Sequence, residues 1–261
     1  MIIDKNLKKH TCFQLIDECI EFYKDLSHST LGFLTYYELG VIYNLDSDIF
    51  LSINNSLKSI KQILSSGQVN DAYALIRKFY DVIIINTYEI IILKDEMNSK
   101  KFNIERVNRW FSGDEKLPRF GEMNKVINNN VDLGNINKMF KKDDRYPQIR
   151  DRCNDHTHYN FFQYMQQNIE IVVSNPELIL NRIRDDLQDL VILHFGYLFT
   201  LNAYYMSASE YIDSLDFNRE PPKGSQYWVA KFAQDFFNKI VKTRRPDIAD
   251  IIINESYMNL E

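Results

Sequence analysis

The stretch that decides the fold class is DAYALIRKFYDVIIINTYEIIILK, residues 71–94. Coiled at 3.6 residues per turn, it places Ala74, Phe79 and Ile83 on one broad apolar face. Its second half is rich in β-branched residues, which favour strands, but such propensity is a weak guide. Because the run continues without a break from Asp71, the pattern predicts a long helix that is buried on most sides.

The composition extends this prediction to the whole chain. Of 261 residues, 45% are hydrophobic and 26% are charged, which is typical of a globular protein rather than of a disordered one. Only 8 Gly and 6 Pro residues are present, and this scarcity of turn formers argues against a turn-rich β-sandwich. We therefore expect an all-α protein, a helical bundle of long antiparallel helices.

The apolar spacing and the breakers divide the chain into segments. Helices are expected at 11–27, 31–45, 47–65, 70–94, 146–173, 176–215, 226–242 and 247–258. An Asn-Pro-Glu start signal stands at 175–177. Gly, Pro and Asn residues break the pattern over 98–145, which is expected to be an insertion of short helices and loops. The linker 216–225 then separates a main bundle, 1–215, from a C-terminal helical appendage, 226–261.

Charge and cysteine usage limit the location and the partners. The formal net charge of −5 gives no general attraction to nucleic acid or to anionic membranes. Cys12, Cys19 and Cys153 lack zinc-site spacing, and the N-terminus lacks a signal-peptide core, so a cytoplasmic protein is expected. Leu190–Met206 is uncharged and approaches the length of a membrane span, but its polar residues favour a buried core helix, and no membrane association is expected.

Chemistry-bearing side chains concentrate in the segment YPQIRDRCNDHTHYN. On a helical wheel, Arg150, Asn154 and His158 form one stripe inside the apolar face. Arg152 and His156 fall on the opposite, more solvated side. The polar side chains of this stripe need hydrogen-bonding partners, because an unpaired buried polar group costs about 1–3 kcal/mol of folding free energy.

Two interpretations of the stripe are open. In the structural one, Arg150 and His158 pair with carboxylates on neighbouring helices, for which Asp81, Asp185 and Asp186 are candidates. In the functional one, an imidazole that moves protons near neutral pH and a guanidinium that holds a phosphate converge on a phosphodiester.

Residues 138–152 carry six Lys and Arg residues against three Asp residues. Lys141, Lys142 and Arg145 are therefore candidate substrate-binding residues, although a solvated charged face explains them equally well. No metal and no cofactor are expected. His156 and His158 are two apart, so on a helix they point away from each other and cannot share one ion.

The cluster resembles the motif of the HEPN superfamily, helical proteins that carry an Arg, a spacer of four to six residues and a His. Arg152 and His158 have five residues between them, and so do Arg150 and His156. One departure matters. Arg150 and His158 share a face of the wheel, but their spacer of seven residues lies outside the family range.

Two further stretches carry the resemblance. The run IRDRCNDHTHYN is similar to the Asn-Asp-x-x-His helix of uncharacterised bacterial HEPN-like and abortive-infection-type families, with Asn154 and His158 as the matching pair. Upstream, DAYALIRKFYDVIIINTYEI resembles the long helix of the same families, with Arg77 and Asp81 at the matching places.

The resemblance implies a helical bundle, often a homodimer, in which the Arg/His helices of two protomers meet at a shared cleft. Active members are metal-independent endoribonucleases, in which the RNA 2′-hydroxyl attacks the adjacent phosphate, His transfers protons and Arg stabilises the charge. By this resemblance Arg152 and His158 are catalytic, with Arg150, Asn154 and His156 in support. RNA, a second copy and a cognate protein are the expected partners, in a bacterial defence or toxin system. The rival is a non-catalytic helical interaction or scaffold protein.

Overall fold

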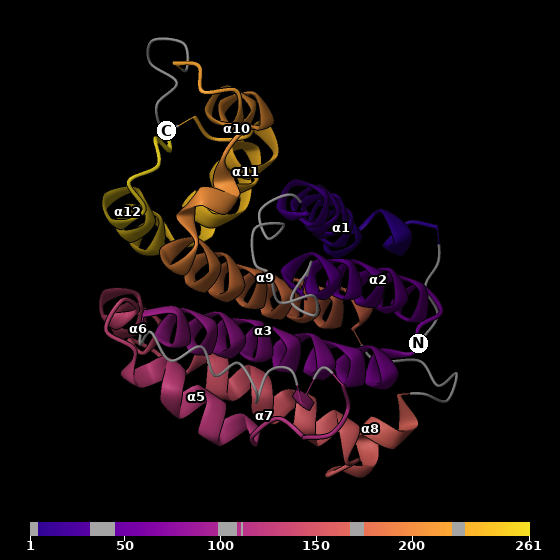
Figure 1. The fold of residues 1–261 in the computed structure, drawn as a ribbon. Coiled ribbons are helices and arrows are strands. Elements are labelled where there is room, and N and C mark those ends of the chain that lie inside the picture. Colours follow the sequence, from indigo (N-terminus) through magenta and orange to yellow (C-terminus); the bar gives the residue numbers. More distant parts are fainter. Residues whose placement is uncertain (1–4, 32–44, 99–108, 111, 168–174, 221–227) are drawn as a thin grey trace.

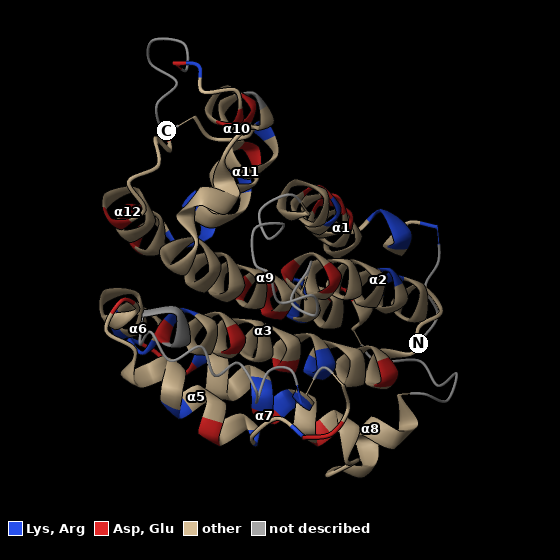
Figure 2. Cartoon of the chain, viewed as in Figure 1, with Lys and Arg blue, Asp and Glu red and all other residues tan. Residues whose placement is uncertain are grey.

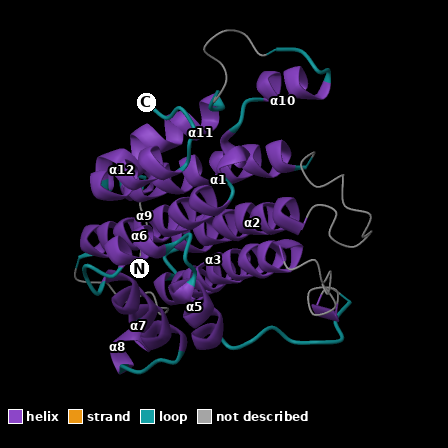
Figure 3. Ribbon diagram, turned by 60° about the vertical axis from the view of Figure 1, so that its left-hand side comes forward, coloured by secondary structure: helices purple, strands orange, loops and turns teal. Residues whose placement is uncertain are grey.

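The fold is all-α, as predicted. The structure, a computed structural model, describes residues 5–31, 45–98, 109–110, 112–167, 175–220 and 228–261. These residues form helices joined by loops, with one isolated bridge between Ser207 and Val229 and no strand among them (Figure 3).

The helices lie in layers around one central helix. In chain order they are η1 (Leu7–Lys9), α1 (Thr11–Thr30), α2 (Leu45–Ser65), α3 (Val69–Asn98), α5 (Phe120–Asn129), α6 (Gly134–Phe140), α7 (Arg145–Thr157), α8 (Phe162–Gln166), α9 (Pro176–Leu201), η2 (Ala203–Met206), α10 (Ser209–Asp216), α11 (Lys231–Phe236), the π-helix η3 (Phe237–Lys242) and α12 (Pro246–Glu255). Figure 1 shows α3 between α1, α2 and α9 on one side and α5 to α8 on the other. Of the last three α-helices, α12 packs on α9 and α6, and α11 packs on α1.

The core is built on α9, whose residues 190–199 are all buried. Aromatic rings join it to its neighbours. Phe22 of α1 stacks on Phe236 of α11 with ring centroids 4.0 Å apart, and both rings contact Phe195. Gly196 permits α6 to approach closely, because a Cβ there would lie 2.7 Å from the side chain of Ile136.

A chain of hydrogen bonds crosses this apolar core. Tyr23 donates to His194 Nδ1 at 2.7 Å, His194 Nε2 donates to Asn86 Oδ1 at 2.9 Å, and Asn86 donates to Asp46 at 2.7 Å. Tyr205 donates to the other carboxylate oxygen of Asp46. Each donor in this row of hydrogen bonds meets an acceptor, and the row ties together α1, α2, α3, α9 and η2. Burial lowers the pKa of His194 to about 3, so this imidazole is neutral.

Sequence signals act at the end of α2 and, as predicted, at the start of α9. Gly67 ends α2 with φ of +81°, a backbone conformation that favours glycine, and its N–H bonds Leu64. Asn175 caps α9 by accepting from the N–H of Leu178 at 3.1 Å, and Pro176 occupies the first helical position.

Two expected helices are shorter than predicted. The helix predicted over 176–215 ends at Leu201, because Asn202 leaves the helical conformation with φ of −127° and ψ of 63°. η2 and α10 complete that segment. The helix predicted over 146–173 ends at Thr157, for a reason given below. Of the segment 31–45, nearly all lies outside the described residues.

The remaining elements follow the prediction more closely. Short helices α5 and α6 occupy the described part of 98–145, and α11, η3 and α12 account for the closing helices. The division into two domains stays a prediction. Within the described part of the chain, no helix is both long and apolar enough to cross a membrane.

Candidate functional site

Helix α7 holds most of the candidate residues, and its rotation decides where each one lies. Ile149, Cys153 and His156 are buried at helical spacing and face the core. Arg150 and Arg152 differ by two positions, so they lie on opposite flanks of this buried face. Arg150 faces α3 and α5, whereas Arg152 faces α9.

The predicted positions of the two histidines were wrong. His158 was expected on the inward stripe, but it follows the last helical residue and is exposed. His156 was expected on the solvated side, but only 6% of it is accessible. The helix stops here because Tyr159 adopts φ of +51° and Asn160 bonds back to Asp155 at 3.0 Å, which turns the chain away from the helix axis.

His156 is held between two aromatic rings. Its imidazole stacks on Tyr73 and contacts Tyr164 at a tilt of 37°, with ring centroids 4.1 Å apart in each case. Its Nδ1 lies 2.6 Å from Asn70 Oδ1 and donates a proton to that amide oxygen. Burial lowers the pKa of His156 to about 4, so the ring is neutral at physiological pH.

Arg152 forms a paired salt bridge with a buried aspartate. Its Nε donates to Asp186 at 3.0 Å, and its Nη2 donates to the other oxygen of the same carboxylate. Tyr73, the ring under His156, also donates to Asp186, at 3.2 Å. The Asp186 side chain is 3% exposed, and its burial raises the pKa while the bonds from Arg152 and Tyr73 oppose that change.

Arg150 has a different surrounding on the other flank of α7. Its Nη1 donates to Asp81 at 3.2 Å, which confirms one pairing of the structural interpretation. Arg77 lies 3.5 Å from the same carboxylate oxygen, so two guanidinium groups share one aspartate. The guanidinium of Arg150 also lies over the ring of Phe120, 3.2 Å from its centroid. Burial, and then the charge of Arg77, lower the pKa of Arg150.

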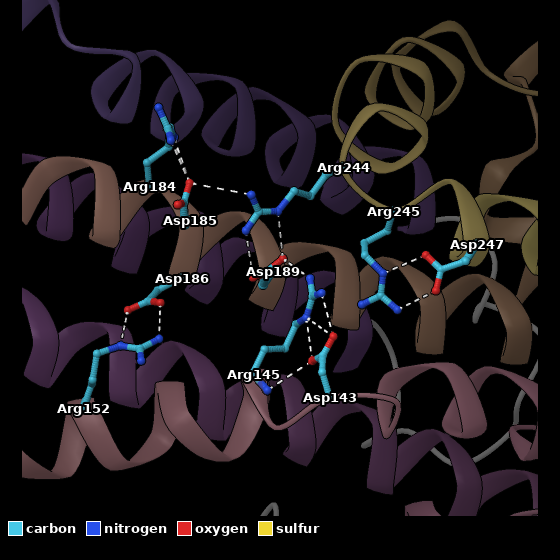
Figure 4. A network of polar contacts seen from close by, with 10 residues as sticks. All are labelled: Asp143, Arg145, Arg152, Arg184, Asp185, Asp186, Asp189, Arg244, Arg245 and Asp247. Carbon is cyan, nitrogen blue, oxygen red and sulfur yellow. Dashed lines mark hydrogen bonds and ion pairs between the residues drawn. The ribbon is translucent and has the colours of Figure 1, made fainter. Parts of the chain in front are cut away.

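The third candidate arginine belongs to a network of ion pairs along α9, shown in Figure 4. Arg145 bonds Asp143 and also donates to Asp189 at 3.0 Å. Arg244, near the end of the chain, donates to Asp189 at 3.1 Å. We call the set of contacts among the following residues the α9 ion-pair network: Asp143, Arg145, Arg152, Arg184, Asp185, Asp186, Asp189 and Arg244.

A cleft of about 430 Å³ runs along this network between α7 and α9. The arginines that line it are mostly bonded to aspartates, as Arg145, Arg152 and Arg244 are. Figure 2 shows basic and acidic residues interspersed along these helices. Lys141 and Lys142, the other two candidate substrate-binding residues, lie outside the network and are exposed. The network therefore joins helices to one another and leaves little unpaired positive charge for a polyanion.

The end of α7 forms an exposed corner. His158 has no side-chain partner among the described residues, and Asn154, one turn earlier, is partly exposed. Next to His158 the chain exposes several large apolar side chains. We define the α7 corner as His158 together with Tyr159 (42% exposed), Phe161 (54%), Phe162 (71%) and Met165 (47%).

The structure thus separates the residues that the sequence grouped. Arg152 and His156 are joined through Tyr73 and Asp186, and Arg150 is joined to Asp81. Sequence reasoning missed Asn70, Tyr73 and Asp189, whose partners come from distant segments; the short spacing from Asp185 to Asp189 on a buried helix was the only signal. The described residues contain no group of His, Cys, Asp or Glu that fits a metal ion.

Comparisons of the chain with protein-family models, with curated proteins and with solved structures found no match.

Proposed function

We propose that the chain is a HEPN-like, metal-independent endoribonuclease whose catalytic centre is the α7 corner. The observation that carries the proposal is the exposure of His158 at the end of the helix that bears the Arg/His motif. His156 is a poor catalyst, because it is buried and its pKa of about 4 makes it a weak base near neutral pH. The role of proton transfer therefore falls to His158.

The proposed reaction needs a base and an acid. The 2′-oxygen of RNA attacks the adjacent phosphorus and gives up its proton, the bond from phosphorus to the 5′-oxygen breaks, and that oxygen takes a proton. One exposed histidine per chain supplies one of these groups at a time. A homodimer supplies two copies of His158, and the exposed apolar side chains of the α7 corner are suited to bury against a second copy.

Arginine has a defined role in this proposal. Arg152 uses Nε and Nη2 for Asp186, so Nη1 stays available to donate to a phosphate oxygen. Asp186 thereby orients the guanidinium, which is 24% exposed. Asn154 lies one turn before His158 and is available to position it or the substrate. Lys141 and Lys142 are exposed and supply positive charge for RNA binding, whereas Arg145 and Arg150 are bonded to aspartates and hold α7 in place.

The test is cleavage of a labelled single-stranded RNA in the presence of EDTA. We expect products with 2′,3′-cyclic phosphate and 5′-hydroxyl ends, and a loss of rate of about 10²–10⁴-fold in His158→Ala. His28 is the matched control, because it is an exposed histidine in the last turn of α1. Both variants should unfold within about 0.5 kcal/mol of the wild type, since both side chains are exposed. Wild-type protein that leaves RNA intact contradicts the proposal.

The second candidate is a non-catalytic helical interaction or scaffold protein. It is favoured by the internal partners of Arg150, Arg152 and His156, which give all three a structural role without any substrate. Under this alternative His158→Ala changes nothing in the RNA assay. Phe162→Asp then tests the α7 corner as an interface, because a charge there weakens self-association measured by analytical ultracentrifugation.

A cytoplasmic location, a cognate protein partner and a role in bacterial defence or in a toxin system belong to the same proposal. A defence or antitoxin-like gene beside the coding sequence would support that role.

A further inference from the structure

The two ends of the cleft between α7 and α9 lie beside different parts of α7. Arg145, at the start of α7, pairs with Asp189 of α9. Arg152, two turns later on α7, pairs with Asp186, about one turn earlier on α9 (Figure 4). The two helices therefore run in opposite directions along the cleft. The end marked by Arg152 lies toward the last turn of α7, where the α7 corner begins.

Arg182 adds a positive charge to the Arg152 end of the cleft. It lies one turn before Asp186 on α9, and it lines the same cleft. Arg182 is exposed, and it pairs with no carboxylate in the described part of the chain. Because Asp186 cancels the charge of Arg152, Arg182 gives this end one net positive charge.

The opposite end of the cleft has a surplus of negative charge. Asp143 is bonded to Arg145, and Asp189 is bonded to both Arg145 and Arg244. Asp144 also lines this end, and it is exposed and pairs with no cation among the described residues. A phosphate here would meet the free carboxylate of Asp144, and like charges repel each other. An anion is therefore expected at the Arg152 end alone.

Two amides add neutral donors to the Arg152 end. Gln148 is one turn before Arg152 on α7, Asn181 adjoins Arg182 on α9, and both line the cleft. Neither side chain has a hydrogen-bond partner within the ranges that the structure describes. Arg152 gives Nε and Nη2 to Asp186 and keeps Nη1 unused. Unused donors of four side chains thus line one end of one cleft.

A phosphodiester suits these donors. Its two free oxygens carry one negative charge and accept several hydrogen bonds, and a guanidinium binds such a group with two parallel bonds. The three other arginines of the cleft, Arg145, Arg152 and Arg244, are bonded to its aspartates. Arg182 is the arginine of this cleft that is free to bind an external anion.

We infer that Arg152 and Arg182 together hold one phosphate of an RNA strand, and that the amides of Gln148 and Asn181 bond the same phosphate. The strand crosses the cleft at this end, next to the α7 corner. This inference rests on the proposed function for the identity of its ligand. Arg182 is a substrate-binding residue in it, and takes no part in proton transfer at His158.

The test is the binding of a labelled single-stranded oligonucleotide with 2′-O-methyl riboses, which lacks the attacking hydroxyl and stays uncleaved. Fluorescence anisotropy measures its affinity for the full chain at a series of salt concentrations. We expect Arg182→Ala to weaken binding about tenfold. The slope of log affinity against log salt concentration should also become shallower by about 0.7, the value for one phosphate contact on a single strand.

Variants at the same site separate charge from hydrogen bonding. Arg182→Lys keeps the charge but loses the paired donors, so it should bind more weakly than the wild type with the same salt slope. Gln148→Ala and Asn181→Ala remove neutral donors, and each should weaken binding about threefold without changing the slope.

Arg219→Ala is the matched control, because Arg219 is an exposed arginine outside the cleft and its loss changes the net charge equally. It should leave both the affinity and the salt slope unchanged. Melting curves check that every variant folds. The inference is overturned if Arg182→Ala binds the oligonucleotide as Arg219→Ala does, or if the wild type does not bind it.

Cleavage of unmodified RNA separates this inference from the proposed function. If the wild type cleaves RNA and Arg182→Ala changes neither KM nor oligonucleotide binding, the phosphate site is wrong and the nuclease stands. If the wild type never cleaves RNA but Arg182→Ala still weakens binding, the nuclease is wrong and the phosphate site stands. Where both are right, Arg182→Ala should raise KM about tenfold with little change in kcat, because the contact is already made before the reaction.

Discussion

The two flanks of α7 use similar residues in opposite ways. Toward α9, Arg152 is bonded to Asp186 and the neighbouring arginines of the α9 ion-pair network are bonded to further aspartates. Toward α5, Arg150 shares the half-exposed carboxylate of Asp81 with Arg77 and lies over the ring of Phe120. A buried, doubly bonded ion pair holds two helices together, whereas a pair whose carboxylate is exposed to water contributes little to stability. The ion pairs that gather along α9 in the described part of the chain are therefore structural.

The largest expected effect comes from breaking the ion pair on the α9 flank. Asp186→Ala removes a carboxylate with 3% exposure, and leaves both Arg152 and the hydroxyl of Tyr73 without a partner. We expect a loss of about 3–5 kcal/mol in the free energy of unfolding. Asp81→Ala is the matched control on the other flank, since Asp81 is 36% exposed and its loss should cost about 1 kcal/mol or less.

Urea denaturation of both variants measures this difference. Equal losses of unfolding free energy in Asp186→Ala and Asp81→Ala would contradict a stronger ion pair on the α9 flank. The double variant Arg152→Met/Asp186→Leu should be more stable than Asp186→Ala, because it leaves no buried charge without a counter-charge.

The next effect is a dependence of stability on pH. The folded pKa of His156 is about 4 and that of His194 is about 3, both below the ordinary value of 6.5. The unfolded chain therefore binds more protons than the folded one in this window. Stability is fully present above about pH 6.5 and falls as the pH falls toward 4, by about 1.4 kcal/mol per pH unit for each histidine.

His156→Phe isolates one of the two contributions. Phenylalanine keeps a ring between Tyr73 and Tyr164 but cannot take up a proton. The slope of unfolding free energy against pH, measured in urea between pH 4 and 6.5, should fall by about 1.4 kcal/mol per unit. His28→Phe, at an exposed position, should keep the slope of the wild type. A slope that His156→Phe leaves unchanged would contradict the neutral, stacked histidine.

The sequence predicts the fold better than it predicts the site, for a physical reason. The helix over 70–94 follows from a long apolar period, and the pairing of Arg150 with Asp81 was among the foreseen alternatives. The inward position predicted for His158 was wrong because the predicted helix continued past Thr157, where neither Gly nor Pro marks an end. Residues 162–166 fall within the predicted helix 146–173 but form the separate helix α8.

When the wheel is drawn for Arg145–Thr157 alone, Ile149, Cys153 and His156 define the buried face of α7. His156 moves inward, and the two arginines move to the flanks. The bonds of Arg152 and Tyr73 to Asp186 could not be foreseen, since these residues meet only through the packing of α3, α7 and α9. Local signals fix helices, but which polar groups stay unpaired is decided by tertiary contacts.

The smallest expected effect concerns the turn that ends α7. Tyr159 adopts φ of +51°, which costs a residue with a side chain about 1 kcal/mol relative to glycine. Tyr159→Gly should therefore be more stable than Tyr159→Ala by about this amount in urea denaturation, because both variants lack the ring and differ only in backbone freedom. Tyr159→Ala also shows separately what the exposed ring contributes. If the two variants unfold at the same urea concentration, the helix does not end in the left-handed turn, and His158 is not presented on the α7 corner as described.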